Sequence, residues 1–463
     1  MNDIKPFEFA EICNQLKIKI MKNFKMITPL LLGGLVLMSA CKKEENENEN
    51  NNGEGPKYAD VQPSFSTNAT LKSSGNTQYF PILRGNTADP MVFWSEKDNN
   101  IPKIKGVKLS GNAASGSIID VDVEIGANNS GESTNQSVAY DPTTGKYLSV
   151  HMYNQTGQFG MVGKLFTSTD QTQAQFPIDG PFVYTNDSPN HPEIAVSSNG
   201  VFGVVFTTNT GFFTSSKIAF KAVNASNATV IPAPVADTQN GIELTDVQSS
   251  SADIAWNSQA GVFGIVYHSG TTTNSKIMYV SVNETGTIVT APTEIHNIGN
   301  TVDFPKIKED GDGFAVICQD YSKVNFEGET ELSGTPAIIL KRISASGVVK
   351  EMSGDVNLVN TINKSVLMSN PYLAAAYIHF DFTVSASNSK YGVVWATQDA
   401  PYQIQFAEAT FTGDVVVTSE PVNVSVSTEN SDTPTVNYIN GKYVITYAGH
   451  TGVSYTNRIV VQN

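Results

Sequence analysis

Acidic residues recur at the starts of strand-like segments, where paired carboxylates could carry acid–base chemistry. Glycoside hydrolysis needs two facing carboxyl groups, one as general acid and one as base or nucleophile. Acidic residues at strand starts also cap turns by accepting backbone N–H bonds, so a structural role is the competing interpretation. The candidates for either role are Glu193, Asp253, Asp303 and Asp381.

Metal and cofactor chemistry has little support in the sequence. The six histidines lie at no close ligand spacing, and there is no His-Glu-x-x-His pair. No Asp-x-Asp-x-Asp-Gly loop is present either, although structural calcium held by scattered carboxylates stays open. Phosphate loops, dinucleotide fingerprints and nucleophile elbows are also absent from the sequence. We therefore predict no metal centre and no cofactor.

One apolar motif is repeated along the chain and must position these side chains. In Val201–Phe206 two aromatic residues enclose a small residue and two aliphatic ones, and Val262–Tyr267 and Lys390–Trp395 match it. The looser copies are Pro90–Trp94, Lys146–His151, Gly313–Cys318 and Lys442–Tyr447. Successive copies end 57, 55, 61, 51, 77 and 52 residues apart. A period in this range indicates a stacked or radial array of sheets.

Each copy lies among other strand-like runs, one before it and two after it, bounded by Gly, Asn, Ser and Asp. The repeated strands are apolar at consecutive positions, which indicates cover on both faces. A sandwich array covers only some strands in this way, whereas a ring of blades covers all seven. We therefore predict an all-β fold, a seven-bladed β-propeller of four-stranded antiparallel blades over residues 58–463. The small third residue predicts a close approach of backbones near the axis.

The two ends of the folded region indicate how the ring closes. The last blade stops after its third strand, Arg458–Val461, and no outer strand follows. Asp60–Phe65 and the residues after it precede the first blade and have no other partner. We predict that this N-terminal segment adds the outer strand of the last blade and so removes an exposed edge.

The N-terminal region has the composition of an export signal. Two lysines precede an apolar run that is too short to span a membrane. The run ends in Leu37-Met38-Ser39-Ala40-Cys41, which resembles the lipobox of bacterial lipoproteins, with Met38 where the family usually has Leu. The resemblance implies cleavage before Cys41 and a diacylglycerol on its sulfur. Residues 1–40 are then a signal region, with Met21 as the true start.

The stretch after Cys41 is polar. Residues 42–57 are Lys, Glu, Asn, Gly and Pro only, so they cannot bury a core and we predict a disordered tether. An acid-rich stretch after a lipidated Cys resembles the surface-export signal of some Gram-negative lineages. That resemblance implies attachment to the outer membrane, with the propeller facing the cell surface. Cys318 is left alone in the exported chain and is predicted to be a buried small residue without a disulfide.

The charge balance and the small number of arginines each exclude one class of function. Residues 41–463 keep 24 Lys plus Arg against 41 Asp plus Glu, a net −17 compared with −15 for the whole chain. This balance repels anions and excludes a general nucleic-acid footprint. A sialidase-type site needs an arginine cluster for a carboxylate substrate, and the chain has only Arg84, Arg342 and Arg458. We therefore expect neither general nucleic-acid binding nor a sialidase-type site.

One end of the predicted ring, which we call the mouth, gathers the loops that join second to third strands and one blade to the next. These loops are rich in Asn, Thr, Ser, Asp and aromatic residues, a composition that suits glycans and also peptides. An insertion between Cys318 and Pro336 also lies there, and such insertions often carry function. The ligand-binding candidates on the mouth are His191, His268, Asp320, Tyr321 and His450.

These observations favour a lipid-anchored binding or scaffold module over an enzyme. The expected ligand is a glycan or a partner protein of the cell envelope, bound at the mouth. The first alternative is a carbohydrate-active hydrolase or lyase that uses two of the four carboxylates. The second is a structural subunit of an envelope complex.

Overall fold

A computed structural model describes much of Pro56–Asn463. In this part of the chain it contains no helix with the length and hydropathy of a membrane span. The described residues are 62–66, 69–71, 78–85, 90–98, 101–110, 113–123, 136–155, 158–183, 190–208, 216–234, 241–245, 249–270, 275–299, 305–320, 325–327, 331–333, 337–350, 352–354, 357–359, 379–385, 389–397, 401–412, 415–451 and 454–463.

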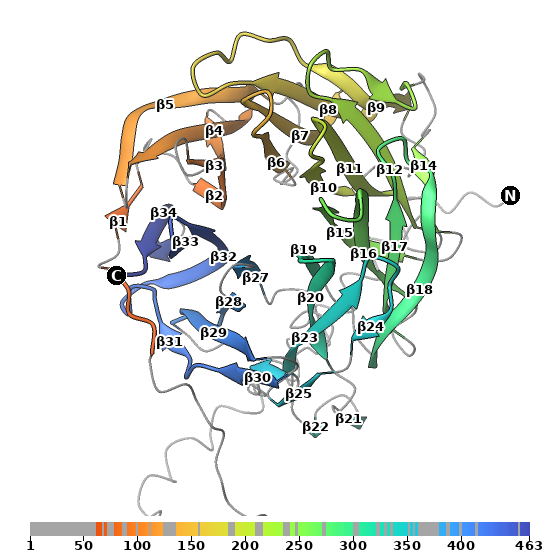
Figure 1. Cartoon of the computed structure of the whole chain (residues 1–463). Helices are drawn as coiled ribbons and strands as arrows, with labels where there is room; N and C mark the ends of the chain where they lie inside the picture. The colour runs from red at the N-terminus through yellow and green to blue at the C-terminus, as the bar shows by residue number, and fades with distance from the viewer. Residues whose placement is uncertain are drawn as a thin grey trace, which may run out of the picture. The chain divides into compact units, whose positions relative to one another are not determined.

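Seven antiparallel sheets follow one another around a ring, as predicted, and each adds its strands from the axis outward (Figure 1). The inner strands are β2 (Gln78–Arg84), β6 (Gln136–Asp141), β10 (Asn190–Val196), β15 (Ser249–Asn257), β19 (Lys306–Asp310), β27 (Phe380–Ser385) and β32 (Asn430–Ile439). The second strands are β3 (Met91–Asp98), β7 (Lys146–Gln155), β11 (Val201–Thr208), β16 (Val262–Ser269), β20 (Gly313–Asp320), β28 (Lys390–Ala396) and β33 (Lys442–Thr451). All seven copies of the sequence motif therefore form second strands.

The outer half of each blade is less regular. The third strands are β4 (Ile101–Ser110), β8 (Gln158–Phe166), β12 (Lys217–Asn224), β17 (Ser275–Val282), β23 (Ala337–Ser344), β29 (Ile404–Thr412) and β34 (Ser454–Val461). The fourth strands are β5 (Ala113–Val123), β9 (Phe176–Val183), β13 (Val230–Ile231), β18 (Ile288–Gly299), β24 (Val349–Lys350), β30 (Val415–Thr418) and β1 (Ala69–Thr70). Short extra strands lie beside blades 3, 5 and 6: β14 (Ile242–Glu243), β26 (Asn357–Val359), β31 (Val422–Asn423) and the parallel β25 (Ser353–Gly354).

The closure of the ring is confirmed. Strand β1 pairs with β34, with Ala69 opposite Ile459, and Phe65 bridges to Gln462 further along. The Ser66 N–H donates to the Val461 carbonyl at 2.8 Å. The N-terminal segment thus completes blade 7 as its outer strand, because that edge would otherwise present unpaired backbone groups.

The second strands are covered on both faces, which explains their unbroken apolar pattern. Every residue of β16 is buried, and all of β11 except Val201. Each blade packs between two neighbours, so alternation of polar and apolar residues would place polar groups in a dry interface. Cys318 on β20 is one of these buried residues, as predicted.

The prediction that the small third residue of the motif allows backbones to approach closely near the axis is wrong. The small residue makes room for an aromatic ring from the next blade. A Cβ on Gly264 would lie 2.5 Å from the ring of Phe314 in blade 5. A Cβ on Gly392 would lie 2.5 Å from the ring of Tyr443 in blade 7. The aromatic second residue of one motif thus fills the space that the small third residue of the preceding motif leaves open.

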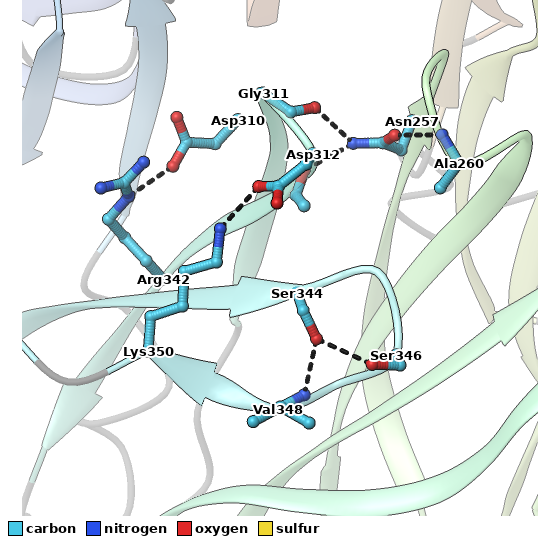
Figure 2. Close-up of polar contacts among 11 residues, drawn as sticks. Asn257, Ala260, Asp310, Gly311, Asp312, Arg342, Ser344, Ser346, Val348 and Lys350 are labelled. Atoms are coloured by element: carbon cyan, nitrogen blue, oxygen red, sulfur yellow. Dashed lines mark hydrogen bonds and ion pairs between the residues drawn. The ribbon is translucent and has the colours of Figure 1, made fainter.

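Polar contacts at the end of the ring opposite the mouth also join blades 4, 5 and 6. The Asn257 amide of blade 4 donates to the carbonyl of Gly311 at 3.0 Å in the first turn of blade 5 (Figure 2). Nearby, Arg342 pairs with Asp310 at 2.6 Å (Figure 2). The Arg342 guanidinium lies 5.2 Å from the centre of the Phe411 ring in blade 6. These turns are therefore held by contacts between blades.

The predicted insertion after Cys318 contains the hairpin of β21 (Asn325–Glu327) and β22 (Glu331–Ser333). Its strands pair with each other and not with a blade.

Candidate functional site

A layer of side chains from the seven inner strands surrounds the axis at one level. Each blade contributes one inner-strand residue to this layer. It is the residue that pairs with the next-to-last residue of the second-strand motif, as Glu193 does with Val205 and Asp253 with Val266. We call this set the channel layer. Its members, in blade order, are Ile82, Ser137, Glu193, Asp253, Lys306, Asp381 and Thr435.

Three of the four predicted carboxylates belong to this layer, and they converge on a lysine that the sequence analysis missed. Lys306 Nζ lies 3.3 Å from Glu193 Oε1, although their blades are separated by blade 4. Burial acts to lower the pKa of Lys306, but the charges of Glu193, Asp253 and Asp381 outweigh it and the pKa is raised. Lys306 therefore stays protonated and balances the acidic layer. Aligning the blades on their motifs would have found it.

The carboxylates of the layer also bind the backbone of the following blade. Asp253, which is 6% exposed, accepts a hydrogen bond from the Ile307 N–H at 2.8 Å. Asp381 makes the equivalent bond with the Val436 N–H at 3.0 Å. The immediate role of these two bonds is to join neighbouring inner strands.

A second polar cluster lies at the mouth, where blades 6 and 7 meet. His379, just before β27, places its Nδ1 2.6 Å from Oδ1 of Asp432 on β32. Both side chains are about one-third exposed, at 35% and 37%. Burial acts to raise the pKa of Asp432, but the hydrogen bond and charge of His379 outweigh it and the pKa is lowered. Asp432 is therefore a fixed anion that faces partly into solvent.

Aromatic and amide groups continue this cluster across blade 7. On adjacent strands Asn430 lies opposite His450, and His450 lies opposite Tyr455. The rings of His450 and Tyr455 stack at 4.5 Å with 28° between their planes. Blade 6 adds Tyr402, whose N–H donates to Asn430 Oδ1 at 2.9 Å. We call Tyr402, Asn430, His450 and Tyr455 the mouth row.

A partly buried ion pair lies next to the mouth row in sequence and in blade 7. Arg458 of β34 binds the carboxylate of Glu429 with both Nε and Nη2, at 3.1 and 2.8 Å. Arg458 also donates to Thr70 of the closing strand. Gly449 has to be small here, because a Cβ would lie 2.3 Å from Glu429 Oε1. The ion pair therefore connects the blade 7 residues of the row to the N-terminal strand that completes blade 7.

Another His–Asp pair joins blades 4 and 5 at the same end of the ring. His296 Nε2 of β18 lies 3.1 Å from Oδ2 of Asp320 on β20. Its side chains are 16% and 15% exposed, less than half as much as those of His379 and Asp432. Asp320 was a predicted ligand contact, and its placement in this pair supplies a comparison for the mouth row.

The remaining predicted residues are dispersed. His268 is buried inside β16, with Nδ1 3.4 Å from the Ser250 hydroxyl, and does not lie on the following loop as predicted. The reason is that β16 continues to Ser269. His191 lies in β10, but its side chain is outside the described part. Asp303, Tyr321 and Cys41 are also outside the described residues.

Metal ligands do not gather in the part of the chain that the structure describes. No group of three or more His, Cys, Asp or Glu is placed there to hold a metal ion. A cavity of about 720 Å³ lies at the opposite end of the ring, between blades 7 and 1, and is lined by residues that include Lys108 of β4, Lys442 of β33 and Asn440 in the turn before β33. It is far along the strands from the mouth row, so volume alone does not mark the predicted site.

Comparison with known proteins supports the fold and adds no family. No protein-family profile matches the chain, and no curated protein matches it. Among solved structures, a polysaccharide lyase, an ulvan lyase, is similar with a TM-score of 0.54 and 10% identity, over 83% of this chain and 93% of that one. This chain is thus similar in fold to the lyase.

Two other glycan-active enzymes are similar at a lower level. The α-L-arabinanase of Penicillium chrysogenum, complexed with arabinobiose, has a TM-score of 0.44 and 10% identity over 86% of this chain and 98% of that one. The sialidase of Trypanosoma rangeli has a TM-score of 0.40 and 9% identity over 75% of this chain. This chain spans only 56% of the sialidase's length.

Proposed function

We propose that the protein is a binding propeller of the cell envelope that holds a glycan at the mouth of its ring. The mouth row is the observation that carries this proposal. It combines an exposed aromatic ring, a stacked imidazole–phenol pair and an amide beside the Asp432 carboxylate. Sugar units present an apolar face and hydroxyls that both donate and accept, and such side chains match both.

A binding role agrees with the state of the channel layer. Its carboxylates are engaged with Lys306 and with backbone N–H groups of neighbouring blades, so their bonds are used within the ring. A glycan array probed with the purified full-length chain tests the proposal. We expect binding to a restricted set of glycans. Failure to bind any glycan, together with capture of a defined envelope protein at micromolar affinity, would favour the scaffold alternative.

A carbohydrate-active hydrolase or lyase is the second candidate. It is favoured by the convergence of Glu193, Asp253 and Asp381 around Lys306 on the axis. The wild type would then cleave members of a polysaccharide panel. Glu193→Gln or Asp381→Asn would abolish the cleavage in variants that still fold, as a cooperative melting transition would show. The absence of reducing ends or unsaturated products across the panel would exclude this candidate for those substrates.

We further propose that Cys41 carries lipid and anchors the chain to the outer membrane, with the propeller on the cell-surface side. The support is the lipobox-like Leu37–Cys41 and the polar tether after it. In cells fed labelled palmitate we expect label on the wild type and none on Cys41→Ser. Digestion of intact cells by external protease tests the outward orientation.

A further inference from the structure

The mouth row has a geometry that defines which part of a glycan it can hold. Directly opposed residues on antiparallel strands point to the same side of a sheet. Asn430, His450 and Tyr455 are opposed in succession across β32, β33 and β34. They therefore form one continuous strip, with the stacked rings at one end and the amide at the other.

Tyr402 of blade 6 extends this strip as an aromatic platform on a fixed backbone. Tyr402 is 42% exposed, yet its N–H donates to Asn430 and its carbonyl accepts from the Ser431 N–H at 2.8 Å. Gln403 beside it donates to the Glu429 carbonyl at 3.0 Å. A large ring that is exposed on a fixed backbone loses little entropy when a ligand covers it.

The charges around the row indicate the class of sugar. Asp432 is an anion held by His379, and the Glu429 carboxylate next to the row is neutralised by Arg458. The whole chain is acidic, at −15. A uronate or sulfated sugar would meet a fixed carboxylate and a repulsive overall field, whereas a hydroxyl can donate to Asp432.

From this arrangement we infer that the blade 6–7 mouth row binds one neutral pyranose unit of a glycan chain, with Tyr402 stacked on its apolar face and Asn430 and Asp432 bonded to its hydroxyls. This inference rests on the proposed glycan-binding function. It adds the position of the subsite and the preference for uncharged sugar.

The test uses the full-length chain and defined probes. These are hexasaccharides of β-glucan, mannan and xylan, with uronate and sulfated oligosaccharides of similar length, measured by titration calorimetry. We expect a neutral probe to bind best, and Tyr402→Ala to weaken it about 10-fold, which corresponds to about 1.4 kcal/mol. Tyr402→Trp should retain binding because it keeps an aromatic face.

A control comes from the other His–Asp pair. His296→Ala should leave binding within about twofold of the wild type, since a change below 0.5 kcal/mol is expected for a residue outside the contact. Melting temperatures of all variants separate lost binding from lost folding. Tyr402 is exposed, so its variants should melt close to the wild type.

The outcomes separate this inference from the function on which it rests. If the wild type binds none of the probes or arrayed glycans, the proposed function fails and the inference with it. If the wild type binds but Tyr402→Ala binds equally well, the function stands and the subsite is wrong. If uronate or sulfated probes bind best, the neutral preference is overturned.

Discussion

The channel layer and the mouth row are built from similar side chains, but their surroundings differ. In the channel layer Asp253 is 6% exposed and binds the backbone of the next blade. At the mouth Asp432 is 37% exposed and binds a histidine that is also partly in solvent. A buried carboxylate with fixed partners stabilises the ring, whereas a half-exposed one can exchange partners with a ligand. The difference separates the residues that hold the propeller together from those that can recognise something.

The largest effect should follow from opening the ring itself, which underlies both regions. Deletion of residues 58–71 removes β1 and the Phe65 bridge, and leaves the edge of β34 unpaired. We expect a protein that aggregates or melts far earlier than the wild type, by calorimetry. A melting curve that is unchanged by the deletion would show that closure contributes nothing.

Loss of the positive charge of Lys306 should have the next largest effect on stability. Lys306→Met leaves Glu193, Asp253 and Asp381 without their shared positive charge. The side chains of Lys306 and Glu193 are 26% and 28% exposed, so we expect a cost of at most about 3 kcal/mol, the upper end of the range for a polar group left without its partner. Urea unfolding measures the change, and Lys306→Arg should cost less because it keeps the charge. An equal loss in both variants would indicate that shape, and not charge, matters in the layer.

The pH dependence of Lys306 has a defined sign. Its pKa is raised in the folded protein, so its contribution to stability is complete below the unfolded pKa of about 10.4 and is lost as the pH rises through the folded value. The stability difference between the wild type and Lys306→Met should therefore shrink in alkaline solution. A difference that stays constant as the pH rises from about 10 to about 12 would contradict the coupling.

Disturbing the apolar packing between second strands of neighbouring blades should reduce stability by less than loss of the Lys306 charge. Gly264→Ala would place a methyl group 2.5 Å from the Phe314 ring and should cost about 1–3 kcal/mol through overpacking. Phe314→Leu in the same chain should restore part of the loss, so a double-mutant cycle in urea measures the coupling. Purely additive losses would mean that the two residues do not compete for one space.

The smallest effect on stability is expected at the mouth. Asp432→Asn should change stability little at neutral pH, because the side chain is partly solvated. The pKa of Asp432 is lowered from its usual 3.8, so its contribution is present above that value and is lost as the pH falls through the folded pKa. The two melting temperatures should therefore converge below about pH 4, near the unfolded value. A large loss at pH 7 would place Asp432 with the structural residues.

Local pattern was sufficient to predict the blades but insufficient for the site. The unbroken apolar motif predicted seven second strands, because cover on both faces is a property of each strand and its near neighbours. Glu193, Asp253 and Asp381 were predicted near the starts of strands, and they occupy equivalent register positions on the inner strands. Lys306 was missed because each strand was considered alone, although its register is the same as theirs.

The sequence by itself determined the number of blades, their four-stranded build and the strand that closes them, since these follow from periodic burial and from one missing edge. Only the tertiary structure decided which charges meet. Lys306 and Glu193 are 113 residues apart and His379 and Asp432 are 53 apart, and no local pattern encodes either pairing. The ring brings these strands to one axis and one mouth, and burial at each place then decides whether a carboxylate holds the fold or faces a ligand.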